Sequence, residues 1–583
     1  MSSKSLDNQP QWLGHPVGLF ILFFTELWER FSYYGMRALL VLYIYSSIED
    51  GGLGWTRKEA LELYGWYTML VYVASIPGGI LADRLLGQKR AVMLGGILLC
   101  IGHMVLAVEA LWAFYAGLGL IILGVGCLKP NISTMVGGLY KQGDDRRDKG
   151  FIIFYIGINI GAFLSALIVG YVGEKIGWHY GFGLAGLGMI LGQIVYVWGQ
   201  KYLVGVGDFL GSKNSVDKEA MNRPLTKIEK DRVIVLILSF IIIVVFWGAF
   251  EQAGGLLNIY ANEKIDLTLD AFNWKVPASW FQSVNAFFII TFGTAVAAFW
   301  AWRKRQGKEV SSLFKMGVGT IVMGLGFLLM AGASVEAGGE AYGKAAMIWL
   351  IGAYLLHTLG ELCVSPVALS FITKLAPIKY ASIMMGVYFA ATGFGNKLAG
   401  SIGEAAQPES IEVAFVASAA DVDGLNLDPS LNSDYTLIDS LVDNDKNFAL
   451  RARIEQDASG ELHFYNYEAQ NDQDFLEFVE IGPEAMTTLK NTIAQGEEGE
   501  QLHATLKFEK DVEAKKIKAN KGDVKNYGGE IVVEEVQNRR EFNIFLFITG
   551  LTVIFGLLII LFLRKLKALT HGAEEIELEG GGH

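Results

Sequence analysis

Charge and cysteine are both scarce in this chain of 583 residues. Charged residues account for 19% of it and hydrophobic residues for 52%, and the mean hydropathy is +0.36. A soluble domain of this length would carry considerably more charge, so the composition excludes an ordinary soluble protein. The three cysteines, Cys100, Cys127 and Cys363, all fall in apolar stretches, which indicates buried thiols rather than a disulfide framework.

Motifs for nucleotide and metal chemistry are also missing. The sequence has no GxxxxGK(S/T) loop, so ATP-driven activity is not expected. It has no HExxH helix, and although His357 and Glu361 stand four residues apart, no third ligand follows at a suitable spacing. We therefore expect no enzyme activity, no cofactor, no resident metal ion and no nucleic-acid partner.

Long apolar runs dominate what is present. Twelve of them reach roughly 20 residues or more, which is enough for a helix to cross a bilayer. They cover residues 17–47, 57–81, 90–108, 111–139, 150–173, 181–203, 232–260, 279–302, 313–333, 345–373, 381–403 and 542–563. The first run is too long and too charged for a cleavable signal peptide, so we expect it to remain as a helix. The sequence predicts an all-α polytopic membrane protein with twelve transmembrane helices.

Basic residues gather on alternate links between these runs. Examples are DRLLGQKR after the second run, KQGDDRRDKG after the fourth and RKRQGKE after the eighth, whereas the opposite links are poorer in bases. Because basic links stay in the cytoplasm, we expect both termini there and the protein in the inner (plasma) membrane. The link between the eleventh and twelfth runs then lies in the periplasm or outside the cell.

That link, residues 404–540, has a different character. It contains 29 acidic and 13 basic residues and no cysteine. Alternating runs typical of strands occupy Phe448–Ile454, Leu462–Tyr467, Leu502–Phe508 and Glu530–Val536. We predict a small, mostly β domain inserted in a loop, whose partner the sequence does not identify.

A long polar stretch after the sixth run separates two sets of six helices. The predicted segments are an N-terminal bundle at 1–203, a cytoplasmic linker at 204–231, the first five helices of a C-terminal bundle at 232–403, the insertion at 404–540, the twelfth helix at 541–566 and a cytoplasmic tail at 567–583. Each bundle thus contributes six helices, and the second one is interrupted by the insertion.

The first apolar run carries a charged stripe. Glu26, Arg30 and Arg37 lie at membrane depth, where ionised side chains are expensive and usually mark functional sites. Together with Tyr33 and Tyr34 they recur at helical spacing and share one face. That face cannot contact lipid, so it must line a wet cavity or meet charges on other helices.

Several segments resemble a known family. Gly78–Arg90 (GGILADRLLGQKR) resembles the loop signature of the major facilitator superfamily. Glu26–Gly35 (ELWERFSYYG) resembles the ExxER signature of the proton-dependent oligopeptide transporter (POT) family. Further similar segments are GVGCLKPNIS at 124–133, FYIGINIG at 154–161, FWGAFEQAGG at 246–255, SWFQSVN at 279–285 and GELCVSP at 360–366. The likeness extends over every predicted helix and excludes the 404–540 link.

The resemblance implies the major facilitator fold and a symporter that imports di- and tripeptides together with protons by alternating access. In that fold the first, fourth, seventh and tenth helices surround a central cavity. A zwitterionic peptide requires opposite charges on opposite walls, and the family implies that Arg30 and Lys129 face its carboxylate while Glu361 faces its amine. The implied substrate-binding residues are Arg30, Tyr33, Tyr34, Arg37, Tyr72, Lys129, Asn159, Trp280, Asn285, Glu361 and Ser365.

Proton coupling follows from the same implied charges. The resemblance places Arg37 opposite Glu251 near an outer gate, where protonation of Glu251 would release the arginine. Glu26 and Glu29 would compete with the peptide carboxylate for Arg30. The implied proton-coupling residues are Glu26, Glu29, Arg30, Arg37, Lys129 and Glu251.

The chain departs from the pattern of the family that it resembles in three places. Residues 57–81 contain no histidine, although animal members carry one on the second helix, so carboxylates must handle the proton here. The 204–231 stretch is too polar for the two extra helices of many bacterial members. Animal members carry their outer domain after the ninth helix and this chain after the eleventh, so no role transfers to it.

Two other functions remain open from the sequence. Relatives with the same fold carry nitrate or other small anions, although those carriers lack the complete ExxER pattern. A peptide sensor whose ligand-binding part is the 404–540 domain is the second alternative. Uptake of a labelled dipeptide against nitrate would separate a peptide transporter from an anion carrier. Deletion of the 404–540 domain would separate it from a sensor, because a transporter should keep its uptake.

Overall fold

The protein is described from a computed structural model. The structure describes residues 9–46, 50–141, 144, 146–203, 205–208, 225–269, 272–337, 344–377, 381–406, 448–456, 462–466, 502–508, 530–532 and 539–573. The chain separates into two compact units. The first comprises Met1–Glu336, Lys344–Ala406 and Arg540–His583, and the second comprises Ala337–Gly343 and Gln407–Arg539.

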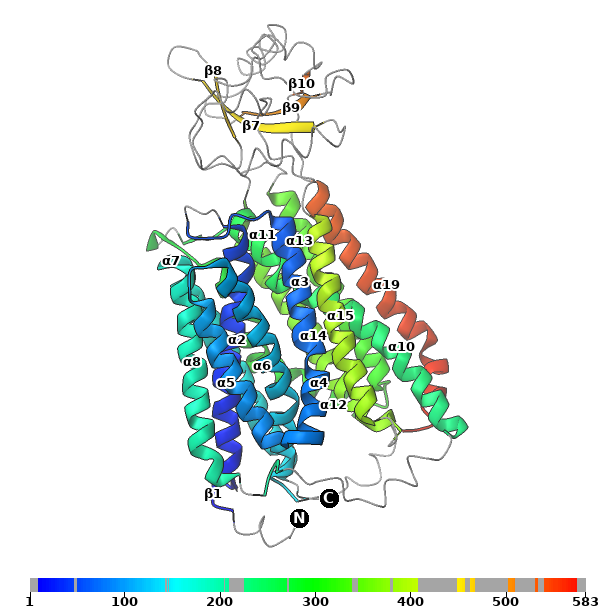
Figure 1. The fold of residues 1–583 in the computed structure, drawn as a ribbon. Helices are drawn as coiled ribbons and strands as arrows, with labels where there is room; N and C mark the ends of the chain where they lie inside the picture. Colours follow the sequence, from blue (N-terminus) through cyan, green and yellow to red (C-terminus); the bar gives the residue numbers. More distant parts are fainter. Residues whose placement is uncertain are drawn as a thin grey trace. The chain divides into compact units, whose positions relative to one another are not determined.

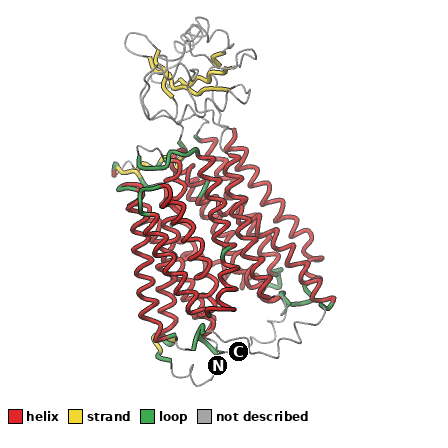
Figure 2. Tube along the Cα trace, viewed as in Figure 1, coloured by secondary structure: helices red, strands yellow, loops and turns green. Residues whose placement is uncertain are grey.

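Long helices make up the first unit, and they run side by side (Figures 1 and 2). The helices of its first half are α2 (Val17–Tyr45), α3 (Arg57–Val73), α4 (Ser75–Leu81), the π-helical turn η1 (Ala82–Leu86), α5 (Gln88–Leu106), α6 (Leu111–Gly138), α7 (Arg146–Lys175), α8 (Trp178–Gly199) and the short η2 (Gln200–Tyr202). A two-residue hairpin, β1 (Gln11–Trp12) with β2 (His15–Pro16), precedes α2.

The second half begins after the polar linker. Its helices are α10 (Lys227–Phe250), the 3-10 turn η3 (Glu251–Gly254), α11 (Leu256–Lys264), η5 (Ala278–Trp280), α12 (Phe281–Arg305), α13 (Ser312–Glu336), α14 (Met347–Leu375), α15 (Ala381–Ala406) and α19 (Arg539–Leu569). Short strand pairs join β3 (Ile265–Asp266) to β6 (Ala345–Ala346) and β4 (Thr268–Leu269) to β5 (Trp274–Lys275).

Capping boxes fix the start of two of these helices. Thr56 accepts a hydrogen bond from the backbone of Glu59, and the Glu59 carboxylate accepts one from the backbone of Thr56. Thr226 and Glu229 make the same pair of bonds before α10. Each box pairs donors that the first turn would otherwise leave free, so both helices begin where the T-x-x-E pattern stands in the sequence.

The two halves meet mainly through α3 against α15 and α7 against α12. Glycine allows the first of these contacts to be close. A Cβ on Gly400 would lie 2.7 Å from the Cα of Gly65, so the two backbones touch where α15 crosses α3.

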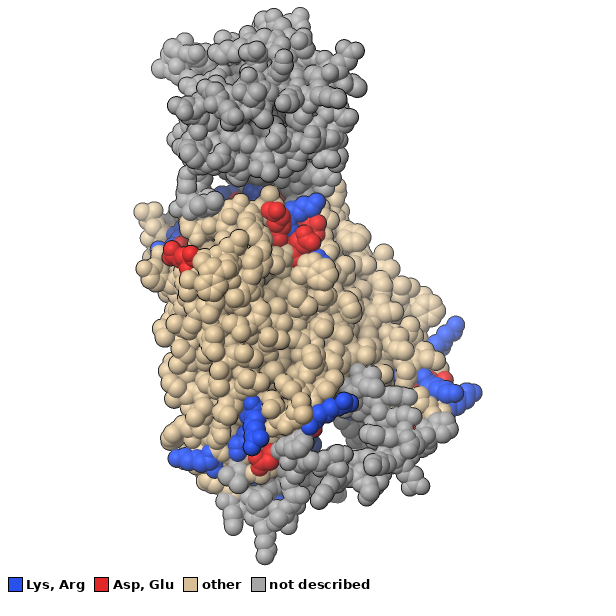
Figure 3. All heavy atoms as spheres, viewed as in Figure 1, with Lys and Arg blue, Asp and Glu red and all other residues tan. Residues whose placement is uncertain are grey.

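Ten helices of the described residues are long and apolar enough to cross a membrane. The face of the molecule drawn in Figure 3 agrees with this, because its charged side chains gather toward the two ends of the helices and leave a band almost free of charge between them. The chain is therefore a multi-pass membrane protein. The other two long helices, α2 and α15, fall outside the ten, so the predicted total of twelve spans is not established by this criterion.

Some helix boundaries differ from the predicted ones. The predicted span at 232–260 is interrupted, because the chain turns into the 3-10 segment η3 at Glu251 before α11 resumes. Two consecutive glycines, Gly254 and Gly255, follow, and Gly255 adopts φ −110° and ψ −104°. The run was predicted as a single span from its length, although Glu251, Gln252 and the two glycines mark the break in the sequence.

The second unit contains a four-stranded antiparallel sheet. Its strands are β7 (Phe448–Gln456), β8 (Leu462–Asn466), β9 (Leu502–Phe508) and β10 (Glu530–Val532), in the order β10-β9-β7-β8. Most of the predicted insertion at 404–540 lies outside the described residues, so its mostly β character stays a prediction. The start of that insertion moves, because α15 continues through Glu404 to Ala406.

Candidate functional site

A cavity of about 190 Å³ lies in the helical unit, between its two halves. Helices α2, α3, α6 and α7 of the first half line it, together with α10, η3, α12 and α14 of the second. It gathers ionisable side chains that are distant in the sequence. These are Arg30, Arg37, Lys129, Glu251 and Glu361.

On one wall, Arg30 is tied to two glutamates of its own helix. Its guanidinium lies 2.6 Å from Glu26 Oε1 and 3.2 Å from Glu29 Oε2. Both carboxylates are completely buried, and Arg30 is only 5% exposed. Glu26 and Arg30 stand four residues apart on one helix, which places their side chains next to each other. The local sequence therefore specifies this pair. Arg30 lines the cavity, whereas the two glutamates lie behind it.

Lys129 lines the same side of the cavity from α6. Its ammonium sits 3.7 Å from the centre of the Tyr72 ring, a cation–π distance. Among the residues that the structure describes, no carboxylate forms an ion pair with it. Its charge is therefore available to an anion that enters the cavity.

The facing wall presents an acidic group. Asn285 of α12 donates to Glu361 Oε2 of α14 at 2.8 Å and to Thr358 Oγ1 at 3.0 Å. Glu361 is 9% exposed and, within the described residues, pairs with no cation. Because the amide holds the carboxylate without neutralising it, this wall attracts a positive group.

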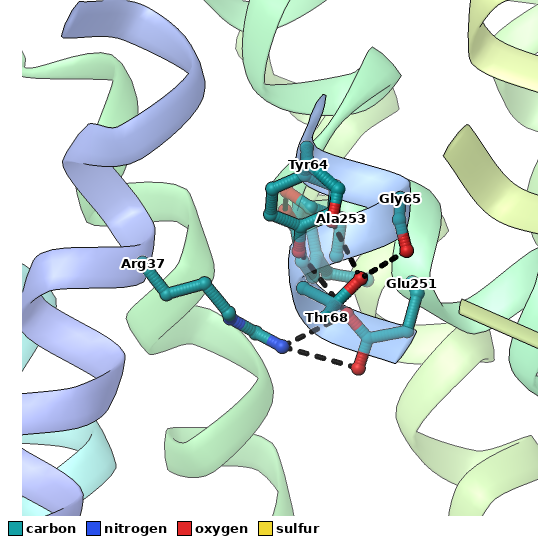
Figure 4. Close-up of polar contacts among 7 residues, drawn as sticks. Arg37, Tyr64, Gly65, Thr68, Glu251 and Ala253 are labelled. Carbon is teal, nitrogen blue, oxygen red and sulfur yellow. Dashed lines mark hydrogen bonds and ion pairs between the residues drawn. The ribbon is translucent and has the colours of Figure 1, made fainter. Parts of the chain in front are cut away.

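A second buried ion pair joins the two halves (Figure 4). Arg37 of α2 donates to both oxygens of Glu251, at 3.1 and 2.8 Å, and Tyr64 of α3 donates to Glu251 Oε2 at 3.2 Å. Glu251 is the first residue of η3, so its carboxylate stands at the helix break. Breaking this pair would leave an uncompensated buried charge, which makes its opening dependent on a proton or another partner.

More contacts join the halves at the end that carries α11. Arg57 Nε donates to Glu263 Oε1 at 2.8 Å, and Asn258 donates to the carbonyl of Ala38 at 2.9 Å. In addition, the Glu174 carboxylate of α7 accepts hydrogen bonds from the backbone N–H groups of Ala278 and Ser279, at 3.0 and 2.9 Å. The halves are thus fastened together at this end of the cavity.

Most of the predicted site residues meet in this one cavity. Those that line it are Arg30, Tyr34, Arg37, Tyr72, Lys129, Asn159, Glu251, Asn285, Glu361 and Ser365. Tyr33 and Trp280 do not. The Trp280 indole donates to the carbonyl of Leu167 at 3.0 Å and packs on Trp274, while Tyr33 is buried with its ring edge-on to Tyr34.

Several residues that line the cavity were not predicted from the sequence. They are Tyr155, Trp247, Phe250, Gln282, Tyr354 and His357. A signal for two of them was available, since Gln282 and His357 lie three and four residues before Asn285 and Glu361 on the same helices. The described residues contain no group of three or more potential metal ligands, and His357 instead stacks on Phe327 at a ring-centre distance of 4.5 Å.

Comparisons with known proteins agree on one family. A sequence model of the POT family matches residues 89–207 and 209–413. The peptide transporter YePEPT of Yersinia enterocolitica is 35% identical over 463 residues, which cover 69% of this chain and 90% of that protein. The uncharacterised transporter YclF of Bacillus subtilis is 39% identical over 445 residues, covering 66% of this chain and 88% of that protein.

Solved structures give the same result. A crystal structure of a peptide transporter POT in complex with sulfate is 36% identical, with a TM-score of 0.64, and covers 69% of this chain and 91% of that one. A POT family transporter in complex with 5-aminolevulinic acid is 32% identical, with a TM-score of 0.63, and covers 68% and 92%. The chain therefore belongs to the proton-dependent oligopeptide transporter (POT) family.

Proposed function

We propose that this protein is a proton-coupled symporter that imports di- and tripeptides across the inner membrane by alternating access. One observation supports this most strongly: a cavity with Arg30 and Lys129 on one wall and Glu361 on the other. A peptide of any sequence has a carboxylate at one end and an ammonium at the other. Two opposite charges at fixed positions can therefore hold the termini while the side chains vary.

The substrate-binding set is the predicted one, with Arg30 and Lys129 at the peptide carboxylate and Glu361, helped by Asn285 and Asn159, at the amine. Tyr34, Arg37, Tyr72 and Ser365 complete the proposed lining of the cavity around the peptide. Neither Tyr33 nor Trp280 lines the cavity, so we propose that they position neighbouring residues and do not contact the peptide.

Proton coupling is proposed from the charges around Arg30. Glu26, Glu29, Arg30 and Lys129 together carry no net formal charge when all are ionised. A peptide carboxylate that binds Arg30 and Lys129 makes this buried group negative, which favours protonation of a glutamate. Substrate and proton then favour the same loaded state, as symport requires. The membrane potential adds about 2.3 kcal/mol per charge per 100 mV.

The Arg37–Glu251 pair is the proposed outer gate. Here the pair is made, and the contacts of Arg57 and Glu174 fasten the same end, which fits a state that is closed to the outside. Protonation of Glu251 would remove its charge and release Arg37, so that α2 and the α10–α11 region could separate.

The remaining architecture is proposed with the function. With α2 and α15 the protein has twelve spans, arranged as bundles at 1–203 and 232–403 with the twelfth helix at 541–566. The linker before α10 and the tail after α19 lie in the cytoplasm, as do both termini, and the insertion between α15 and α19 lies in the periplasm or outside the cell.

Transport in liposomes tests the proposal directly. The purified full-length protein is reconstituted, a pH gradient acid outside is imposed, and uptake of labelled dialanine is followed. We expect accumulation above the external concentration that a protonophore abolishes. Binding of dialanine without uptake would favour a sensor, and uptake of nitrate without dialanine would favour an anion carrier; either result would refute the proposal.

A further inference from the structure

One face of α12 lines the cavity along its first two turns. Gln282, Asn285, Ala286 and Ile289 follow the spacing i, i+3, i+4 and i+7, and all four contribute to the lining. Asn285 already has a role, because it holds Glu361. Gln282 lies about 4.5 Å from Asn285 along the helix axis, toward the start of α12. It is the other polar residue of this face.

Two polar side chains near Gln282 in the sequence are hydrogen-bonded to backbone carbonyls of α7. Trp280 donates to the carbonyl of Leu167 at 3.0 Å, and Ser283 Oγ donates to the carbonyl of Phe163 at 2.8 Å. These bonds anchor the first turn of α12 to α7. Gln282 itself takes no part in the anchoring and faces the cavity instead.

The amide nitrogen of Gln282 has no hydrogen-bond partner in the part of the protein that the structure describes. Its Nε2 atom is enclosed, and among the described residues it has no hydrogen-bond partner. Leaving a buried donor unpaired costs about 1–3 kcal/mol, so such a group is normally matched by a ligand or by water. A primary amide carries a donor and an acceptor side by side, and rotation by 180° exchanges them.

We infer that Gln282 binds the first peptide group of the substrate, with its amide rotated so that the nitrogen faces the cavity and donates to the peptide carbonyl oxygen. This inference rests on the proposed function. The carbonyl carbon of a dipeptide is two bonds from the ammonium nitrogen that Glu361 would hold, and Gln282 is one helical turn from Asn285. A contact to the peptide group is compatible with any side chain, so it adds affinity without narrowing the range of sequences.

Three ligands of equal chain length test this contact. Glycylglycine and 5-aminolevulinate both have a carbonyl at the same distance from the ammonium, whereas 5-aminopentanoate has a methylene there. Inhibition constants against labelled dialanine uptake are measured for the unaltered protein and for Gln282→Met, which keeps the side-chain length but cannot donate. We expect the variant to bind the two carbonyl compounds about tenfold more weakly and 5-aminopentanoate within twofold of the unaltered protein.

The controls separate this inference from the proposed function. Gln306→Met, an exposed position at the end of the same helix, should leave all three constants unchanged. Gln282→Ala repeats the test should the methionine disturb folding. Equal weakening of all three ligands, or no weakening of any, would overturn the role of Gln282 while dialanine uptake by the unaltered protein stands. Absence of that uptake would instead overturn the proposed function, and the inference with it.

Discussion

At the scale of residues, the cavity combines paired and unpaired charges. Arg30 and Arg37 are each bound to glutamates, whereas Lys129 and Glu361 have no oppositely charged partner among the described residues. Buried pairs can serve as switches, because a proton or a ligand changes which partner is neutral. Single charges in a cavity are sites for a ligand of opposite sign.

Neutralising one glutamate of a buried ion pair should separate peptide binding from proton coupling. We expect Glu251→Gln and Glu26→Gln to keep the exchange of labelled for unlabelled dialanine across liposomes and to lose proton-driven accumulation. The reason is that an amide cannot take up or release the proton, while the binding residues stay in place. Counterflow and uphill uptake are measured on the same preparation, and retained uphill uptake would contradict the coupling role.

Glu361 should matter for binding rather than for coupling. Glu361→Gln leaves the ammonium of the peptide without a charged partner, and we expect the apparent KM for dialanine to rise at least tenfold, because charge-assisted hydrogen bonds contribute about 1.5–3 kcal/mol. The control ligand is N-acetyl-alanine, which lacks an ammonium. Its weak inhibition should be unaffected by the substitution, and an equal loss for both ligands would point to general damage.

At the scale of elements, the contact between α3 and α15 depends on two glycines. Gly400→Ala would place a Cβ 2.7 Å from the Cα of Gly65 and 2.8 Å from the carbonyl of Leu61, so we expect a loss of about 1–3 kcal/mol in stability. Gly119→Ala in α6 is the matched control, since a Cβ there meets nothing within 4 Å. It should be neutral or stabilising by up to about 1 kcal/mol. Thermal unfolding in detergent measures both, and equal shifts would contradict the packing argument.

The hairpin before α2 should respond to pH. His15 Nδ1 lies 2.8 Å from Tyr140 Oη, and Arg146 donates to Gln11 and to the carbonyl of Gly14. Burial, aided by the Arg146 charge, lowers the pKa of His15 from its ordinary 6.5. His15 therefore binds a proton more tightly when the hairpin is undocked than when it is docked. Docking of the hairpin weakens as the pH falls through 6.5, the ordinary pKa of the histidine, and below it.

Hydrogen–deuterium exchange of the hairpin backbone measures this effect. After correction for the intrinsic exchange rate, we expect residues 11–16 to be less protected at pH 5.5 than at pH 7.5. His15→Gln, which can still bond to Tyr140 but cannot be protonated, should abolish the difference. The same difference in that variant would exclude His15 as its cause.

At the scale of the whole molecule, the cavity and its gate lie entirely in the helical unit. We therefore expect a protein in which a short glycine–serine linker replaces residues 407–538 to keep proton-driven uptake of dialanine within about threefold. Uptake in liposomes with matched amounts of inserted protein measures this. Loss of transport with intact dialanine binding would assign the insertion a part in the transport cycle.

Much of the site was predictable because charges are rare in apolar helices. Arg30, Arg37, Lys129, Glu251 and Glu361 stand out by their cost at membrane depth, and the structure places all five around one cavity. Gln282 and His357 were missed because polar neutral or weakly basic residues are common inside helix bundles. Trp280 was expected in the cavity, but its orientation depends on a carbonyl of α7, which the local sequence does not reveal.

The sequence by itself determined that the chain is a membrane protein and that Glu26 and Arg30 lie within reach of each other. These features depend on composition and on contacts between near neighbours, which helical geometry fixes. Only the tertiary structure decided that Arg37 meets Glu251 and that Gln282 faces the cavity. Such contacts join residues far apart in the chain, and they depend on how the helices pack, which no local pattern specifies.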